Sequence, residues 1–140
     1  MKKVFTVLLI VISSVAFAQK QQIAKQNYSK IKQNSCIKGE GYKLLLKEVL
    51  TDSRCPEGVT CVWAGEVSVI VSVYKDSEFV EDKKLVFSTN NNTANLNWII
   101  PYLDESHSRI NSLTIAPHPN VGKVIKPKDY YLEIGYLQYN

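Results

Sequence analysis

This chain of 140 residues lacks several features that would point to a particular class of protein. No apolar run reaches the roughly 20 residues needed to cross a bilayer, so we expect no transmembrane segment in the mature chain. There are two histidines and no C-x-x-C pair, and the usual motifs of zinc sites and of thiol oxidoreductases are therefore missing. Internal repeats are absent too, and acidic and basic residues are interspersed, which argues against nucleic acid or anionic lipid as a partner.

Residues 1–18 have the order of a secretory signal peptide: two lysines, an apolar run, and small residues at Ala16 and Ala18. We predict cleavage after Ala18 and export to the periplasm or the extracellular medium. The alternative is an uncleaved N-terminal anchor. Loss of Lys2 and Lys3 lowers the basic residues from 17 to 15 against 13 acidic ones, so the mature chain is nearly neutral, with a net charge of +2.

Residues 19–35 differ in composition from the rest of the chain. They carry four lysines, no acidic residue and many Gln and Asn, a pattern that we interpret as a flexible polar leader. The alternative is a short helix that uses Ile23, Tyr28 and Ile31. Residues 36–140 then form one domain, which is long enough to bury a hydrophobic core.

Alternation of apolar and polar residues dominates residues 36–140. Valines occupy every second position from Val67 to Val73, as expected of a strand with one buried face. Further strands are predicted over Tyr42–Leu46, around Leu85 and Phe87, around Leu113 and Ile115 before Pro117 and Pro119, and over Tyr130–Tyr136 with a bulge at Gly135. The fold class is therefore all-β, an antiparallel β-sandwich or a small barrel.

The connections and the core follow from the same pattern. Residues 75–78 predict a turn, residues 88–93 predict a loop, and Pro101 makes a long helix after Asn95 unfavourable. The expected core consists of Leu44, Leu46, Trp63, Val67, Val69, Val71, Val73, Phe87, Ile115, Leu132 and Ile134.

The most specific segment places two cysteines around a Pro/Gly turn, in the run Asp52-Ser-Arg-Cys-Pro-Glu-Gly-Val-Thr-Cys-Val-Trp-Ala-Gly-Glu66. Cys55 and Cys61 are the natural pair for a disulfide, whose closure stabilises by roughly 2 kcal/mol in the loop-entropy model. Cys36 is then left over as an idle thiol, an intermolecular bridge or a partner in a swapped pairing. Trp63 is expected to pack against the bridge as part of the core, and the alternative is that it is displayed for a ligand.

Two kinds of reactive site can be considered from the remaining residues. For a metal site, five residues between the thiolates is a poor spacing and only His107 and His118 could add imidazoles, so we expect no metal. For a hydrolase, Ser108 stands near His107, Asp104 and Glu105, but no nucleophile elbow accompanies them, and a polar loop is the simpler interpretation.

Three acidic residues cluster around the cysteine segment, namely Asp52, Glu57 and Glu66. They could form paired carboxylates. The simpler expectation is that they are solvated or pair with Arg54, and each exposed pair then contributes less than about 1 kcal/mol to stability.

The run Asp52-Ser-Arg-Cys-Pro56, followed by Cys61-Val-Trp-Ala-Gly65, resembles a signature of small exported bacterial proteins and lipoproteins of uncharacterised function. The segments Ile115–Pro119 and Asp129–Ile134 are similar to the ending of those proteins. The resemblance implies an exported all-β domain with a Cys55–Cys61 bridge, and it implies neither catalytic residues nor a cofactor. This chain lacks the lipid-acceptor cysteine of the lipoprotein members.

The leading functional hypothesis is an exported, non-catalytic β-domain that acts as an interaction module or envelope accessory protein, with an envelope or extracellular protein as its partner. One alternative is a small hydrolase or metal-dependent enzyme with a site built from dispersed residues. Another is a protease inhibitor that presents the Cys55–Cys61 loop, because a pre-organised loop costs less to bind. The candidate site residues are Asp52, Ser53, Arg54, Cys55, Pro56, Cys61, Trp63 and Gly65.

Overall fold

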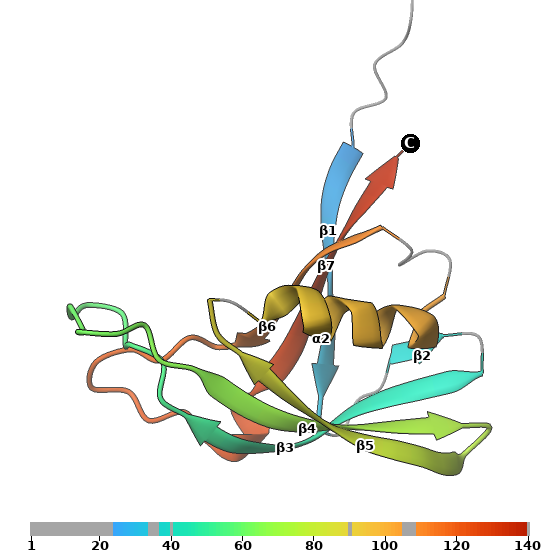
Figure 1. Ribbon diagram of the computed structural model, residues 1–140, viewed down its shortest axis with the longest axis horizontal. Coiled ribbons are helices and arrows are strands. Elements are labelled where there is room, and N and C mark those ends of the chain that lie inside the picture. The colour runs from blue at the N-terminus through green and yellow to red at the C-terminus, as the bar shows by residue number, and fades with distance from the viewer. Residues whose placement is uncertain (1–23, 34–36, 40, 90, 105–108, 140) are drawn as a thin grey trace, which may run out of the picture.

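The structure is a computed structural model that describes residues 24–33, 37–39, 41–89, 91–104 and 109–139 (Figure 1). Its strands are β1 (Ala24–Lys32), β2 (Ile37–Gly39), β3 (Tyr42–Asp52), β4 (Val67–Lys75), β5 (Glu78–Phe87), β6 (Ile110–Ala116) and β7 (Tyr131–Tyr139). Its helical segments are α2 (Asn92–Ile99) and the short 3-10 turns η1 (Ile100–Tyr102) and η3 (Pro127–Asp129).

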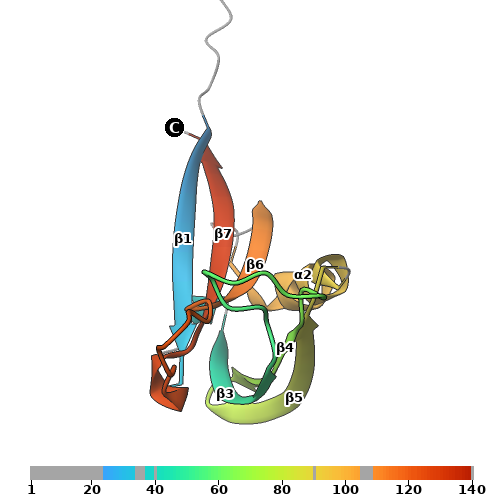
Figure 2. The ribbon, with the colours of Figure 1, turned by 90° about the vertical axis from the view of Figure 1, so that its left-hand side faces the viewer.

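The strands form two antiparallel sheets that face each other (Figure 2). One sheet has the order β1-β7-β6 and the other has the order β2-β3-β4-β5. The helix α2 lies at the side of the sandwich, next to β5 and β6. The predicted all-β sandwich in a single domain is confirmed.

Side chains from the inner faces of both sheets fill the core. The alternating valines of β4 are fully buried, and they face Leu113 and Ile115 of β6 and Leu132 and Ile134 of β7 across the sandwich. The pattern arises because successive side chains of a strand point to opposite faces. Apart from Trp63, every predicted core residue is buried.

The first strand corrects the interpretation of residues 19–35 as a leader. Ala24–Lys32 forms β1, which pairs along β7 from Ala24↔Tyr139 to Lys32↔Tyr131. The segment reads as polar because β1 is an edge strand in which Ile31 alone is fully buried, and backbone hydrogen bonds to β7 do not depend on side-chain hydrophobicity. The folded domain thus includes residues before 36. The predicted signal peptide, the remaining leader residues 19–23 and 34–35, and Cys36 lie outside the described residues.

The connection from β4 to β5 is the predicted turn at residues 75–78. Asp76 and Ser77 both have positive φ, at 49° and 76°, which is the backbone of a two-residue hairpin loop. The predicted bulge is present as a register shift of β6 between Ile110 and Ser112, opposite Gly135. A Cβ on Gly135 would collide with the side chains of Ser112 and Gln26, which explains the glycine.

The helix α2 begins within the segment predicted as a loop and ends at Ile99, just before Pro101 enters η1. Ile99 is fully buried in the core, and Asn95 Nδ2 donates to the backbone oxygen of Val86 on β5 at 2.8 Å. The helix therefore closes part of the opening between β5 and β6. Among the described residues, no helix has the length and apolarity needed to cross a membrane.

Candidate functional site

The cysteine segment connects β3 to β4 and projects from one end of the sandwich, where the loop between β6 and η3 lies beside it (Figure 1). Two backbone hydrogen bonds join these loops: Glu57 N donates to Pro119 O at 2.9 Å, and Val121 N donates to Glu57 O at 3.3 Å. The two loops thus support each other. We call residues 53–66 the cysteine loop and residues 117–126 the proline loop.

The base of the cysteine loop continues the pairing of β3 and β4. Ser53 N donates to Glu66 O at 2.8 Å, and Cys55 N donates to Ala64 O at 2.9 Å. Gly65 is needed here because its φ is +71° and because a Cβ would collide with the backbone oxygen of Ser53. The base is therefore a closely packed ladder that only glycine allows at position 65.

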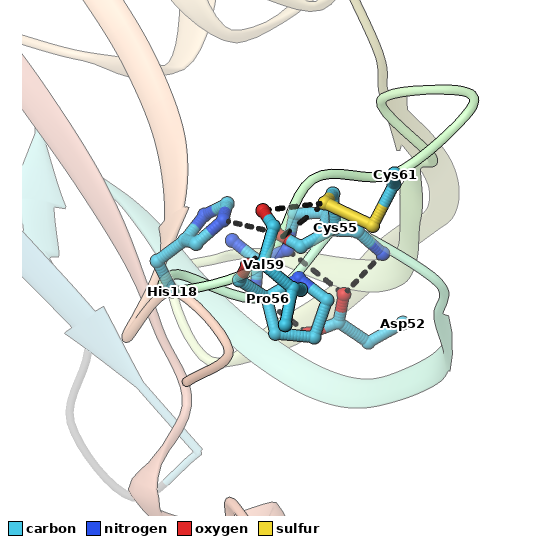
Figure 3. The surroundings of a disulfide bond; sticks show 7 residues. Asp52, Cys55, Pro56, Val59, Cys61 and His118 are labelled. Carbon is cyan, nitrogen blue, oxygen red and sulfur yellow. Dashed lines mark hydrogen bonds and ion pairs between the residues drawn. A yellow bond between two sulfur atoms is a disulfide. The ribbon is translucent and has the colours of Figure 1, made fainter. Parts of the chain in front are cut away.

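The predicted disulfide between Cys55 and Cys61 is present, with Cα atoms 5.9 Å apart (Figure 3). It closes a ring that contains Pro56, Gly58 and Val59. The φ of Gly58 is +91°, so the chain turns tightly inside the ring. The disulfide fixes the tip of the loop in the same way that the ladder fixes its base.

Asp52 and Arg54 form a buried ion pair under the loop. Arg54 Nε and Nη2 donate to the two carboxylate oxygens of Asp52 at 2.8 and 2.6 Å, and the hydroxyl of Tyr130 donates to Asp52 at 3.0 Å. The side chains are only 8% and 11% exposed, so the expectation of an exposed pair worth less than about 1 kcal/mol is wrong. The pair is enclosed by Tyr130, which precedes β7, and by the end of β6, and the local sequence does not reveal these distant contacts.

The electrostatics of this cluster follow from burial and hydrogen bonding. Burial alone raises the pKa of Asp52, but the hydrogen bonds and charge of Arg54, together with the Tyr130 hydroxyl, outweigh it and hold this pKa below its ordinary value. Burial and the hydrogen bond to Asp52 raise the pKa of Tyr130 to about 12. At neutral pH, Asp52 and Arg54 are therefore both charged, and the neutral Tyr130 hydroxyl donates a hydrogen bond to Asp52.

Arg54 also reaches the opposite sheet. Its Nη1 donates to Ile115 O at 2.5 Å and its Nη2 donates to Pro117 O at 3.0 Å. One guanidinium therefore ties the cysteine loop to the end of β6. This role could not be predicted, because the residues involved are far apart in the sequence.

His118 of the proline loop points to the backbone of the cysteine loop (Figure 3). Its Nε2 lies 2.9 Å from Cys55 O, and because a carbonyl oxygen only accepts, Nε2 is the nitrogen that carries the proton in this bond. Of the two histidines considered as metal ligands, His118 thus forms a hydrogen bond to the backbone. His107 lies outside the described residues, as do Glu105 and Ser108.

Two cavities meet at His118. One is a groove of about 480 Å³ between β5, β6 and the cysteine loop, lined by Arg54, Ala64, Gly65, Val67, Phe87, Ser88, Thr89, Asn92, Leu113, Thr114, Ile115, Ala116 and His118. The other, of about 500 Å³, is lined by Glu57, Pro117, His118, Asn120, Lys123 and Ile125. Among the described lining residues, the groove has hydroxyls but no carboxylate, and the second cavity has the Glu57 carboxylate but no hydroxyl or thiol. Neither brings together the three groups of a catalytic triad.

The acidic residues of the cluster do not converge. Glu57 is exposed and its Oε2 accepts a hydrogen bond from Asn120 at 3.3 Å, whereas Asp52 is committed to Arg54 beneath the loop. Within the part of the chain that the structure describes, no group of three His, Cys, Asp or Glu side chains could hold a metal ion. The described acidic side chains of this region therefore do not share one site.

Trp63 does not pack in the core, and that prediction is wrong. The side chain is 66% exposed. The reason is that β4 begins at Val67, so Trp63 lies beyond the last ladder hydrogen bond of the loop and outside the area that the two sheets cover. The signal was present in the sequence, because the alternation of buried residues starts only at Val67.

Other apolar side chains on the two loops are exposed as well. On the cysteine loop these are Val59 at 50% and Val62, which is fully exposed; on the proline loop they are Val121 and Val124. Half of the large apolar side chains that are exposed in the described residues belong to these two loops. These four valines are not among the residues predicted to form the site.

Comparison with protein-family models, curated proteins and solved structures finds no match to this chain.

Proposed function

We propose that this protein is an exported binding module that contacts a protein partner through Trp63 and the neighbouring valines of the cysteine loop. The main support is that the signature contains residues held within the structure and one large side chain that is exposed. Asp52, Arg54 and Gly65 are held within the structure, and Cys55 and Cys61 are bonded to each other. Trp63 is the large side chain of the signature that faces solvent.

The surroundings of Trp63 support recognition of a protein. Tryptophan is enriched among the residues that contribute most to protein–protein affinity, because it buries a large area with few rotatable bonds. The adjacent Val62 is fully exposed, so a partner would bury two large apolar side chains at one point. Exposed apolar side chains gathered at one site are typical of interaction surfaces.

The rigidity of the loop supports the same function. The disulfide, the ladder at the base and the two hydrogen bonds to the proline loop hold the backbone before any partner binds. Binding then costs less conformational entropy than it would for a flexible loop. The tight turn at Gly58 favours this function over a substrate-like inhibitor loop, which needs an extended backbone.

Export is part of the proposal. The disulfide supports it, because such bonds persist in oxidising compartments, and the order of residues 1–18 predicts it. Mass analysis of protein recovered outside the cytoplasm is expected to find Gln19 at the N-terminus. Full-length chain that resists carbonate extraction from membranes would contradict export.

The test compares Trp63→Ala with Phe79→Ala. Phe79 is the second residue of β5, beside the hairpin turn that follows β4, and it is 58% exposed, so it controls for the loss of an exposed aromatic side chain. Each purified protein is immobilised and used to capture proteins from the envelope fraction of the producing cell. We expect a partner that wild type and Phe79→Ala retain and that Trp63→Ala loses. Equal capture by all three proteins would refute the role of Trp63.

A further inference from the structure

The sheet β1-β7-β6 has one accessible edge. β1 is its outermost strand, and Figure 2 shows it along the outside of the sandwich. Tyr28 of β1 is 58% exposed, and the neighbouring Lys25 and Lys30 are exposed as well. The opposite edge is different, because Leu113 and Ile115 of β6 are only 1% and 4% exposed. A further strand could therefore reach this sheet along β1.

The direction of the main-chain groups of β1 follows from its pairing with β7. Leu137 N donates at 3.1 Å to Arg109 O, which directly precedes β6. Successive residues of a strand direct their N–H and C=O groups to opposite sides, so the even-numbered residues of β7 face β1 and pair with its odd-numbered residues. The N–H and C=O groups of Gln26, Tyr28 and Lys30 therefore point outward. In the described residues, no hydrogen bond is found for these main-chain groups.

The side chains of β1 reach across β7 and leave this edge uncovered. Gln26 and Asn111 exchange two hydrogen bonds across the sheet, at 3.0 and 2.7 Å. Lys30 Nζ lies 3.9 Å from a carboxylate oxygen of Glu133 and 4.5 Å from the ring centroid of Tyr131. These contacts hold the strand in place before any partner arrives, which lowers the entropy that binding costs.

The geometry and the charge of the edge select its occupant. A row of outward N–H and C=O groups is complementary to the main chain of another extended segment. The strand carries three lysines, Lys25, Lys30 and Lys32, and no acidic residue. Pairing with a second copy would bring lysines together with no acidic residue on either strand, whereas acidic side chains opposite these lysines would be attracted. The edge therefore favours an acidic segment over a second copy of this chain.

We propose that the free edge of β1 binds an extended acidic segment of another protein, which adds as a fourth strand to the sheet β1-β7-β6. Main-chain hydrogen bonds to Gln26, Tyr28 and Lys30 hold the segment, and its acidic side chains contact the lysines. This surface is separate from Trp63, which lies on the connection between two strands of the other sheet. Binding at β1 does not require Trp63, so the two proposals can fail independently.

The main-chain contact is tested with selected peptides. Random linear peptides displayed on phage are selected against the purified full-length protein, and the affinities of enriched sequences are measured with capped synthetic versions. Tyr28→Pro removes one outward N–H, which an edge strand tolerates because that group does not bond to β7. Tyr28→Thr removes the same ring and keeps the N–H. We expect affinity to be at least about tenfold weaker on Tyr28→Pro than on Tyr28→Thr, which corresponds to roughly one hydrogen bond.

The charge selection is tested by matched reversals. We expect the enriched peptides to be acidic, and their affinity should fall about threefold or more on Lys25→Glu. Lys84→Glu makes the same change of net charge at an exposed position on β5, in the other sheet, and should change affinity less than about twofold. Trp63→Ala should likewise have an effect below about twofold.

Methylation of the peptide main chain tests the strand pairing on the wild-type protein, whether or not Tyr28→Pro folds. Methylating a nitrogen that faces β1 is expected to weaken binding at least about tenfold, and methylating the next nitrogen is expected to have little effect. Circular dichroism and thermal unfolding establish that each variant is folded.

Several results would overturn the inference: no selected peptide, enriched peptides that are not acidic, equal binding to folded Tyr28→Pro and Tyr28→Thr, no loss on Lys25→Glu, or methylation without positional effect. Peptides lost on Trp63→Ala but retained on Tyr28→Pro would overturn the site at β1 while supporting the proposed contact at Trp63.

Discussion

The strand β4 is entered and left by two very different connections. At one end, Asp76 and Ser77 reverse the chain toward β5 with positive φ angles, and Asp76 N donates to Gly41 O at 3.1 Å. At the other end, residues 53–66 use a disulfide, a buried ion pair, a constrained glycine and hydrogen bonds to a second loop. Because two residues are enough to reverse the chain, connectivity does not explain the cysteine loop. Its additional structure is explained if it holds Trp63 and Val62 in place for a partner.

Two ion pairs, one buried under the cysteine loop and one exposed on the four-stranded sheet, sharpen the comparison most. We expect Asp52→Ala to lower the free energy of unfolding by about 3–5 kcal/mol, because it leaves Arg54 buried with only backbone oxygens as partners. Lys47→Ala breaks the exposed pair with Asp82 on the sheet β2-β3-β4-β5. This change should lower the free energy of unfolding far less. Urea denaturation followed by fluorescence measures both. Equal effects would show that the loop cluster is no more structural than the surface pair.

The glycines at positive φ provide the next comparison. Gly65→Ala and Gly122→Ala both place a side chain in the left-handed region, which costs about 1–2 kcal/mol. Only at position 65 does the new Cβ collide with backbone, whereas at position 122 it meets no atom within 4 Å. We expect Gly65→Ala to cost about 1–3 kcal/mol more, as overpacking does. Similar unfolding free energies for the two variants would contradict the packed ladder at the loop base.

Removing the disulfide is expected to have a moderate effect. Replacing Cys55 and Cys61 together by Ser should lower the free energy of unfolding by roughly 2 kcal/mol, because the ring no longer restricts the unfolded chain. The β-sandwich should persist, since the ladder at the base of the loop does not involve sulfur. Thermal unfolding with and without reductant measures the effect, and reduced wild type should match the double variant. No change on reduction would contradict the structural role.

Acidification tests the Asp52 cluster by another route. The pKa of Asp52 is lower in the folded protein than its ordinary value of 3.8. The ionised carboxylate therefore contributes its full stabilising free energy above the unfolded pKa, and this contribution is lost as the pH falls through the folded pKa. The difference in unfolding free energy between wild type and Asp52→Asn should therefore be largest near neutral pH and shrink below pH about 4. If the difference in unfolding free energy stays constant down to pH about 2, the stabilising role of the ionised Asp52 carboxylate is contradicted.

The smallest effect on stability is expected from replacing the exposed aromatic side chains of Trp63 and Phe79. Trp63→Ala and Phe79→Ala remove exposed side chains, and each should change the free energy of unfolding by no more than about 0.5 kcal/mol. Phe79 also packs edge-on against Tyr74 at 5.8 Å, so its replacement is expected to cost slightly more. A large loss of stability in Trp63→Ala would mean that Trp63 is structural and would remove the basis for the proposed function.

The parts of the fold that were predictable follow from alternation. Val67, Val69, Val71 and Val73 identify β4 because one face of a strand in a sandwich must be apolar. The strand β1 is not recognisable in the sequence, because an edge strand can be held by its backbone while only one of its side chains is fully buried. Hydrophobic patterns carry no information about such a strand.

The candidate site was predictable only where the chemistry is local. The Cys55–Cys61 pair is separated by a short turn, and its residues alone favour the bond. The bonds of Arg54 to Ile115 and Pro117 depend on how the two sheets pack, and so does the burial of Asp52. Trp63 was misplaced because an aromatic residue near a disulfide was assumed to cover it, although the strand begins four residues later.

Site-specific photocrosslinking tests most directly whether the cysteine loop exists to present a binding surface. A benzophenone amino acid is placed at Val62 in one protein and at Phe79 in another, and intact producing cells are irradiated. Both positions are exposed, Val62 on the cysteine loop before β4 and Phe79 on β5 just after the hairpin turn, so accessibility alone would label both. The account predicts a discrete crosslinked protein from position 62 that is absent from position 79 and is lost when Trp63→Ala is added. The same products from both positions, or none from position 62, would contradict it.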